Sequence, residues 1–255
     1  MKTISMVGLS TSLLLISQSA VADNSITQKH WVHSVEIYAL GLNITGDTQV
    51  ASANLNVDVD PGFIIDNLDM GAMARWEGIY NNQWGYYIDY SFMKLSGDKT
   101  KVTDSNIGLL SADLDIRQGV LEAKGFKRYE YNNGTIDYMV GLRWWDNDID
   151  LKLSALNDNV QTSPRIDEDW IDYVVGIRWI TPLSNDWVYH LSGDIGLGKD
   201  TRFTSSILTG FRYRFNEWSD LNLAYKSTWV DYDNKDNFSY DTASYGLLIG
   251  LGLYF

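Results

Sequence analysis

Large apolar residues alternate with small or polar ones along much of the chain, which is the period of a β-strand with two unlike faces. In the closing segment, residues 244–255, the large apolar face holds Tyr245, Leu247, Ile249, Leu251, Leu253 and Phe255. The other face is mostly small and includes Gly246, Gly250 and Gly252. The same alternation recurs in WGYYIDYSF (84–92), ILTGFRYRF (207–215) and LNLAYKSTW (221–229). Each such strand has one face for an apolar environment and one for a crowded interior.

Ten segments carry this alternation, near 33–46, 69–80, 84–96, 112–131, 135–145, 170–181, 187–197, 206–215, 221–230 and 244–255. Short connections at 81–83, 132–134, 182–186 and 216–220 alternate with long ones at 47–68, 97–111, 146–169, 198–205 and 231–243. Short turns on one side and longer loops on the other are typical of outer-membrane barrels. The pattern predicts an all-β fold: a closed antiparallel transmembrane β-barrel of ten strands, with eight or twelve as alternatives. Its first and last strands pair, so that no edge stays free.

The first strand is ambiguous, because either of its faces reads as apolar. Val35, Ile37 and Ala39 form one apolar set, and Tyr38, Leu40, Leu42 and Ile44 form the other. A bulge that switches the register would reconcile the two. The segment 112–131 is longer than a membrane span requires and is expected to project beyond the membrane. The segment 62–71 is compatible with a short amphipathic helical turn at the mouth of the barrel.

Two strands are near copies of each other. IDYMVGLRW (136–144) and IDYVVGIRW (171–179) differ at 2 positions. Each places an Asp and an Arg on the face opposite its large apolar residues. We interpret them as two equivalent strands that run in the same direction.

Aromatic residues gather at the ends of the apolar faces, as in the two girdles that flank the apolar band of a membrane barrel. The tryptophans expected in these girdles are Trp76, Trp84, Trp144, Trp179, Trp187 and Trp229. The closing segment also has the length of a tilted membrane strand, about 9 to 11 residues.

The N-terminus has the features of a secretory signal. Lys2 precedes an apolar stretch, and the segment closes with the small residues Ala20 and Ala22 around Val21. We expect a signal peptide over 1–22 and a single barrel domain over 23–255. The chain has no cysteine, which excludes a lipid anchor on cysteine and any disulfide. The formal net charge is -13, and a chain this acidic lacks the basic face that nucleic-acid binding requires.

The chain resembles the small outer-membrane β-barrel proteins of Gram-negative bacteria. The resemblance rests on the signal ending in Ala22, the IDYVVGIRW strand followed by WVYHLSGDIGLG, the GFRYRF strand and the terminal GLLIGLGLYF. It implies a location in the outer membrane and contact with lipid and lipopolysaccharide. It also implies that the final strand ending in Phe255 is recognised by the barrel-assembly machinery. The resemblance does not determine a function, because such barrels include porins, adhesins, enzymes and structural proteins.

Charges of both signs lie on the faces expected to point inward. They are Arg75, Glu77, Asp89, Asp137, Arg143, Asp172, Arg178, Asp194, Arg212, Arg214 and Lys226. A ten-stranded barrel is narrow, and enclosed charges are costly unless they pair. These residues therefore predict an ion-pair network that plugs the lumen, in a monomeric protein with a structural or surface-interaction role. A narrow channel for small solutes is the alternative.

An enzymatic role is the third hypothesis, and no catalytic residue is assigned. His190, Ser192 and Asp194 share one face of a strand, but a spacing of two residues separates neighbouring side chains by about 7 Å, too far for a direct bond. A lipid-directed hydrolase or acyltransferase would use His190. No cofactor and no dedicated metal site are expected, although divalent cations are candidate partners of the acidic outer loops.

Overall fold

The computed structural model describes residues 30–50, 53–104, 108–155, 161–162, 165–236 and 238–255. The segment expected to be the signal peptide, 1–22, lies outside this range. Among the described residues, no helix is both long and apolar enough to cross a lipid bilayer.

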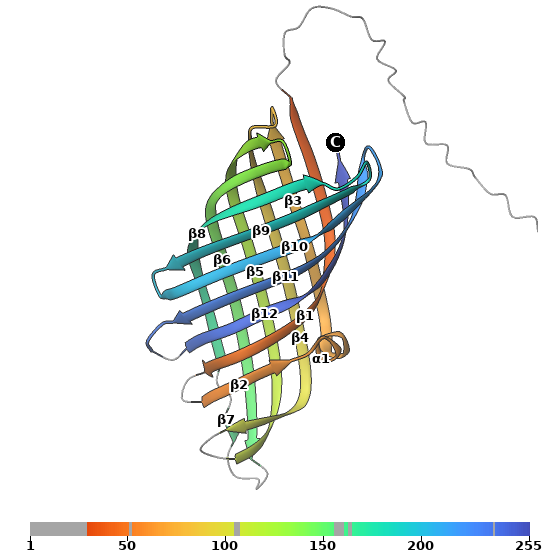
Figure 1. Cartoon of the computed structure of the whole chain (residues 1–255). Helices are drawn as coiled ribbons and strands as arrows, with labels where there is room; N and C mark the ends of the chain where they lie inside the picture. The colour runs from red at the N-terminus through yellow and green to blue at the C-terminus, as the bar shows by residue number, and fades with distance from the viewer. Residues whose placement is uncertain (1–29, 51–52, 105–107, 156–160, 163–164, 237) are drawn as a thin grey trace, which may run out of the picture.

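Figure 1 shows a barrel of tilted antiparallel strands. Its ring consists of β1 (Trp31–Val50), β3 (Leu68–Tyr80), β4 (Trp84–Asp104), β5 (Gly108–Tyr131), β6 (Gly134–Ala155), β8 (Arg165–Pro182), β9 (Trp187–Gly198), β10 (Thr201–Asn216), β11 (Ser219–Asp233) and β12 (Phe238–Tyr254). Pairing of β12 with β1 closes the ring. The predicted closed barrel of ten strands is therefore confirmed. Two further strands, β2 (Ala53–Val59) and β7 (Gln161–Thr162), pair outside the ring with β1 and β6.

The two ends of the barrel differ. One end, here called the turn end, carries the short connections and both the start of β1 and the end of β12 (Figure 1). In the turn between β3 and β4, Asn81 and Asn82 have φ of 50° and 53°, and Gln83 N donates to Tyr80 O at 3.0 Å. Left-handed φ at both central positions is the geometry of a type I′ hairpin turn, which asparagine tolerates well. The opposite end is called the loop end.

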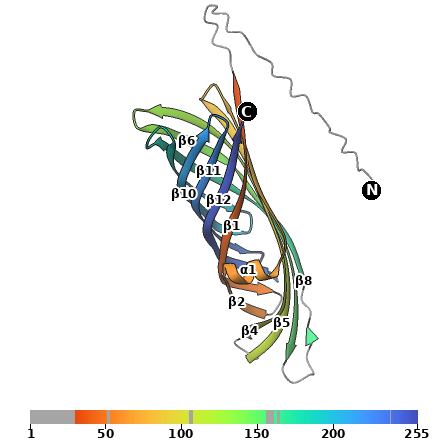
Figure 2. The same cartoon turned by 90° about the vertical axis from the view of Figure 1, so that its right-hand side faces the viewer.

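Much of what the sequence suggested to be long loops at the loop end is strand. β9 and β10 are joined by residues 199–200 alone, where a loop over 198–205 was expected. β4 continues to Asp104 and β5 begins at Gly108, so their side of the barrel extends well beyond the rest at the loop end (Figure 2). The reason is that charged and polar residues interrupt an apolar pattern without interrupting backbone pairing, so the ladders continue past the apolar band.

The first strand has one register throughout. β1 pairs with β12 without interruption from Ser34 to Val50, so the bulge suggested by its two apolar faces does not form there. Tyr38, Leu42 and Ile44 are buried inside the barrel, whereas Ile37 is 65% exposed on the outside. Both faces read as apolar because the interior itself is apolar beside this part of β1.

The two near-identical strands are neighbours in the ring, and the expectation that they run in the same direction is wrong. β6 and β8 pair antiparallel, with Val140 opposite Val175 at the centre. Antiparallel pairing of a repeated sequence brings the Asp of one copy opposite the Arg of the other. Asp137 thus faces Arg178, and Arg143 faces Asp172. The repeat therefore places opposite charges across the two strands, and Asp137 and Arg178 form an ion pair at 2.7 Å.

Outward-facing tryptophans mark two levels on the barrel. Trp76, Trp84 and Trp187 are exposed near the turn end, and Trp179 is half-buried there. Trp144 and Trp229 lie nearer the loop end, where their indole N–H groups donate to Asp169 (3.3 Å) and Asp241 (2.9 Å). Between the two levels the surface carries exposed apolar side chains such as Val175, Leu247 and Ile249.

One short helix interrupts the wall. In α1 (Pro61–Asn67) the Asp60 carboxylate accepts the Phe63 backbone N–H at 2.9 Å, which caps the helix. Ile64 is buried against Leu42, Ile44, Met93 and Leu95. Figure 2 shows α1 beside β1, next to the end of β2. The amphipathic turn expected within 62–71 therefore exists, and it packs one apolar side chain into the barrel.

Candidate functional site

The interior of the barrel contains a connected set of ion pairs, here called the interior network. Its turn-end layer is centred on Arg212 of β10. The guanidinium contacts Glu36 of β1 and lies 3.1 Å from Asp220 of β11. Tyr254 of β12 also donates its hydroxyl to Asp220. Arg212 thus joins three strands, and Asp220 connects β12 to them.

A second layer is centred on Arg178 of β8. Its guanidinium lies 2.5 Å from Glu77 of β3, across the barrel, and 2.7 Å from Asp137 of β6. Arg128 of β5 contacts the same Asp137 at 2.7 Å. The side chain of Asp137 is fully buried, and two arginines compensate its charge.

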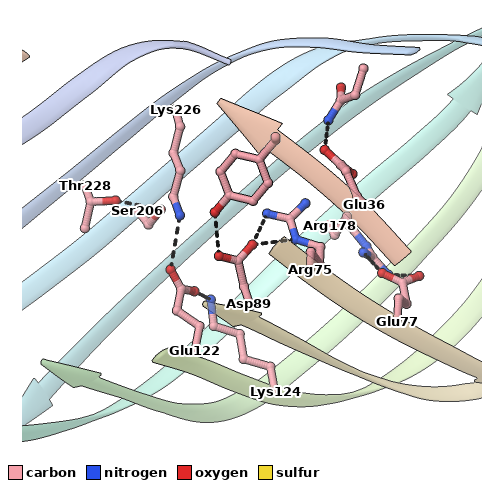
Figure 3. Close-up of polar contacts among 12 residues, drawn as sticks. Glu36, Arg75, Glu77, Asp89, Glu122, Lys124, Arg178, Ser206, Lys226 and Thr228 are labelled. Atoms are coloured by element: carbon pink, nitrogen blue, oxygen red, sulfur yellow. Dashed lines mark hydrogen bonds and ion pairs between the residues drawn. The ribbon is translucent and has the colours of Figure 1, made fainter. Parts of the chain in front are cut away.

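The central layer joins β1, β3 and β4. Asp89 accepts a hydrogen bond from the Tyr38 hydroxyl at 2.7 Å and pairs with Arg75 at 2.7 Å (Figure 3). Arg75 also lies over the ring of Tyr87, 5.6 Å from its centroid. The buried carboxylate therefore has both a charged and a neutral donor.

Lysines supply the layer nearest the loop end. Lys124 lies 2.6 Å from Glu122, and Lys226 approaches Glu122 at 3.5 Å (Figure 3). Lys124 also lies 2.7 Å from Asp194. Arg143 is completely buried, contacts Asp194 at 2.9 Å and donates to the Thr204 hydroxyl at 2.9 Å. This layer links β5, β6, β9, β10 and β11.

The interior network is electrically neutral. Seven cations (Arg75, Lys124, Arg128, Arg143, Arg178, Arg212 and Lys226) pair with seven carboxylates (Glu36, Glu77, Asp89, Glu122, Asp137, Asp194 and Asp220). Every strand of the ring except β12 contributes at least one of them. β12 contributes space instead, because a Cβ on Gly250 would lie 2.6 Å from Glu36 Oε1. The net charge of -13 is therefore carried outside this network.

Nine of the eleven charged residues selected from the sequence lie in these ion pairs. The other two are placed differently. Asp172 accepts a hydrogen bond from Trp145 Nε1 at 3.0 Å, and Arg214 is exposed at the turn end with no ion pair among the described residues. Sequence reasoning missed Glu36, Glu122, Lys124, Arg128 and Asp220. Three of them, Glu122, Lys124 and Arg128, lie on one face of the segment 112–131, where alternation alone is enough to identify them. Glu36 lay in the strand of ambiguous register, and Asp220 was placed in a turn.

His190 does not form a catalytic triad with Ser192 and Asp194. Its Nε2 lies 2.9 Å from Asn222 Oδ1, and Asn222 in turn donates to Glu36 at 2.8 Å. Asp194 is occupied by Lys124 and Arg143. His190 therefore extends the interior network, and its neighbours are an amide and an ion pair.

A cavity of about 290 Å³ lies inside the barrel between the turn end and the central layer. Its lining includes Arg178, Arg212, Arg214, Ser192 and Asp220. Arg214 is the lining cation without an ion-pair partner among the described residues. We call this cavity the vestibule.

Outside the barrel, carboxylates face one another across β5, β6 and β8 near the loop end. Asp115 is opposite Asp150, Asp148 is opposite Asp167, and Asp146 is opposite Asp169. These six residues are called the acidic ladder. Like charges directly opposite in a sheet are destabilising. Arg117 (3.2 Å from Asp146) and Arg165 (3.0 Å from Asp148) neutralise part of the charge. No group of three or more metal-ligating side chains with the geometry of a metal site occurs among the described residues.

A stack of aromatic rings fills the interior beside the acidic ladder. Trp170 stacks on Tyr232 with ring centroids 4.0 Å apart, and Trp145 stacks on the other side at 5.6 Å. Tyr232 donates its hydroxyl to Glu168 at 3.0 Å. Burial, together with the neighbouring Glu168 carboxylate, raises the pKa of the Tyr232 phenol well above its usual range. The phenol therefore stays protonated and continues to donate this bond at physiological pH.

Comparison with solved structures shows the fold. The outer membrane protease OmpT from Escherichia coli is similar with a TM-score of 0.52 and 8% sequence identity, over 92% of this chain and 99% of that one. The translocator domain of the autotransporter NalP from Neisseria meningitidis has a TM-score of 0.48 at 12% identity, covering 89% and 90%. Ail, the attachment invasion locus protein of Yersinia pestis, has a TM-score of 0.37 at 10% identity, covering 88% and 98%. No protein-family model and no curated protein matches the chain. The fold is that of an outer-membrane β-barrel.

Proposed function

We propose that this outer-membrane-type barrel is an integral, monomeric protein of the outer membrane with a sealed lumen, which has a structural or surface-interaction role at its loop end. The observation that carries the proposal is the neutral interior network, whose ion pairs link strands on opposite sides of the barrel. Arg178 to Glu77 is one such link, at 2.5 Å. A solute crossing the barrel would have to separate pairs whose partners are buried, and an unpaired buried charge costs about 3–5 kcal/mol.

The partners we propose follow from the distribution of charge. With a neutral interior, the acidic charge lies at the surface, and the acidic ladder sits just beyond the indole of Trp144. That level corresponds to the headgroups of the outer leaflet if the tryptophans lie at the membrane interface. Divalent cations that bind the ladder would connect it to the phosphates of lipopolysaccharide. During assembly, the terminal strand with Phe255 would be recognised by the barrel-assembly machinery.

Conductance in planar lipid bilayers tests the sealed lumen. The wild-type protein is expected to give no discrete openings. Replacing Arg75, Glu77 and Arg178 together with serine should produce openings, because it removes ion pairs that line the vestibule and close it toward the loop end. Arg165→Ser, on the outer surface, is the control and should remain silent.

The runner-up, a narrow channel for small solutes, is favoured by the vestibule, which is lined in part by charged side chains and occupies the turn-end part of the lumen. Discrete openings of the wild type that change on neutralising Arg143 or Arg178 would replace the sealed barrel with this channel.

We also propose that the protein is not an enzyme. OmpT is described as a protease, so barrels of this fold include enzymes. In this chain, however, His30 and His33 lie at the turn end and His190 lies inside, so no histidine accompanies the carboxylates of the acidic ladder. Overexpression of the wild type and of His190→Ala should leave the phospholipid and lipid A composition equally unchanged. A change produced by the wild type alone would overturn the proposal.

A further inference from the structure

The wall of the barrel is incomplete between β1 and β3. The two strands pair from Trp31 opposite Tyr80 to Ile37 opposite Ala74. Beyond that point β1 next gains a partner on this side at Ile44, which pairs with Val59 of β2. All residues from 38 to 43 and from 68 to 73 are described, and none of them joins the two strands. Residues 38–43 of β1 and 68–73 of β3 therefore border an opening, here called the wall gap.

An insertion creates the wall gap. The six residues 38–43 of β1 lie opposite the fourteen residues 60–73, because pairing stops at Val59 and resumes at Ala74. Most of the surplus is α1, a helix of seven residues and so about 10 Å long. That length is about two strand spacings, so α1 spans the gap at its loop-end side. At the opposite side the gap narrows to the pair of Ile37 and Ala74. It is a wedge roughly 20 Å high, from six residues at about 3.3 Å each.

The wall gap lies within the apolar band of the outer surface. On one side Gly41 pairs with Leu247, which is 73% exposed. On the other side Ala72 pairs with Phe92, and Met70 is 58% exposed. The gap thus faces the hydrocarbon of the leaflet nearer the loop end.

The interior directly behind the wall gap is largely apolar, unlike the layers of the interior network. Leu40, Leu42, Met73, Met93 and Val120 line a cavity of about 60 Å³ there. Phe92, which lies on the outer face of β4, lines the same cavity, so the cavity extends through the wall. The inner end of the cavity is polar, and Glu122 and Lys226 close it. Its volume is about that of two water molecules, which suits the end of a hydrocarbon chain.

We propose that the wall gap is a binding site for a membrane lipid, with the end of one acyl chain in the cavity behind it. An apolar lining that opens onto the hydrocarbon of the membrane selects an apolar ligand. The unpaired backbone groups along both edges of the gap would be costly in pure hydrocarbon. A lipid meets both conditions, because the ester or amide linkage of its chain offers polar atoms beside the apolar tail. The occupant is thus an amphiphile of the surrounding leaflet.

The site goes beyond the proposed sealed barrel but rests on the same membrane-spanning placement. Because the chain has no cysteine, a fluorescent label on a single introduced cysteine can test the lipid site and the membrane placement separately. We would attach bimane to Met73→Cys, to Ile249→Cys on the lipid face, and to Ser192→Cys on the inner face at the vestibule. Each protein is reconstituted into vesicles of phosphatidylcholine with or without bromine on the acyl chains. Quenching at position 249 reports membrane insertion, whatever happens at position 73.

We expect quenching at position 73 to approach that at position 249 and to exceed that at position 192 several-fold. Quenching at position 73 as weak as at position 192 would overturn the lipid site. Weak quenching at position 249 would overturn the membrane placement itself. As a second measurement, Val120→Trp, which fills the cavity, should lower the amount of lipid retained by purified protein in native mass spectrometry. Ile207→Trp, on the outer surface, should not. Equal retention in both variants would also contradict the proposal.

Discussion

The backbone of Phe255 exchanges two hydrogen bonds with that of His33, each 2.9 Å long. The two rings stack with centroids 5.9 Å apart. The last residue of the chain thus fastens the final strand to the first at the turn end, where the ring of strands closes. In a barrel, this pairing is what removes the free edges that lipid cannot satisfy.

Deleting Phe255 should impair assembly. The deletion removes both backbone bonds with His33 and the aromatic contact at the membrane interface, so the β1–β12 seam begins to fray. The expected result is a smaller folded fraction in the membrane, measured by the heat-dependent shift in electrophoretic mobility that folded barrels show. The matched control is Phe215→Ala, because Phe215 is another exposed aromatic at the turn end but lies within the chain. Equal folded fractions for the deletion and the control would refute the closing role of Phe255.

Removing Arg178 should destabilise the barrel strongly. Arg178→Met leaves Glu77 without its cation, and Asp137 keeps only Arg128. Breaking a buried pair from one side costs about 3–5 kcal/mol. Urea unfolding in lipid vesicles, followed by tryptophan fluorescence, measures the loss.

Two comparisons separate this effect from a general surface effect. Arg165→Met removes an exposed ion pair and should cost no more than about 1 kcal/mol. Adding Glu77→Gln to Arg178→Met should recover part of the stability, because the remaining uncompensated charge is removed. If Arg178→Met is no more harmful than Arg165→Met, the interior network does not hold the barrel together.

Alternation was sufficient to predict the strands and most of the charged interior, because the two faces of a barrel strand lie in such different environments. It failed where both environments are similar. Leu40 and Leu42 face an apolar part of the lumen, so the first strand reads alike on both faces. It failed again for the ends of strands, because hydrogen-bonded pairing continues past the membrane where the apolar pattern stops, as at Asp104.

The arrangement of partners was beyond the sequence. Arg178 reaches Glu77, which is 101 residues away and on the opposite wall. Such contacts depend on the size and stagger of the closed ring, and alternation within one strand carries no information about either. The wall gap was likewise invisible, since it arises from a mismatch in length between β1 and the segment that returns beside it.

Glycines should differ sharply in their tolerance of a methyl group. A Cβ on Gly176 would lie 2.6 Å from the carbonyl oxygen of Gly193, so Gly176→Ala forces β8 and β9 apart. Overpacking of this kind costs about 1–3 kcal/mol. A Cβ on Gly193 would meet only the Ser206 carbonyl oxygen, at 3.6 Å. Gly193→Ala should therefore be neutral or stabilise by about 0.4–1 kcal/mol, because it restricts the unfolded chain. Urea unfolding of both variants decides this, and similar losses would contradict the packing argument.

Divalent cations should stabilise the barrel through the acidic ladder. Asp115 and Asp150 lie directly opposite each other, and such like-charge pairs cost roughly 0.2–1 kcal/mol each. Magnesium or calcium relieves this repulsion, so the melting temperature in lipopolysaccharide-containing membranes should be higher with magnesium than with EDTA.

The variant Asp115→Asn with Asp150→Asn should melt higher than the wild type in EDTA and gain less from magnesium. Neutralising two acids at the turn end, Asp186→Asn with Glu217→Gln, is the matched control, because it removes the same charge from turns that lie away from the ladder. That control should keep the full response to magnesium. A wild-type melting temperature that is the same in magnesium and in EDTA would show that the acidic ladder does not bind cations, and the proposed bridge to lipid phosphates would fail with it.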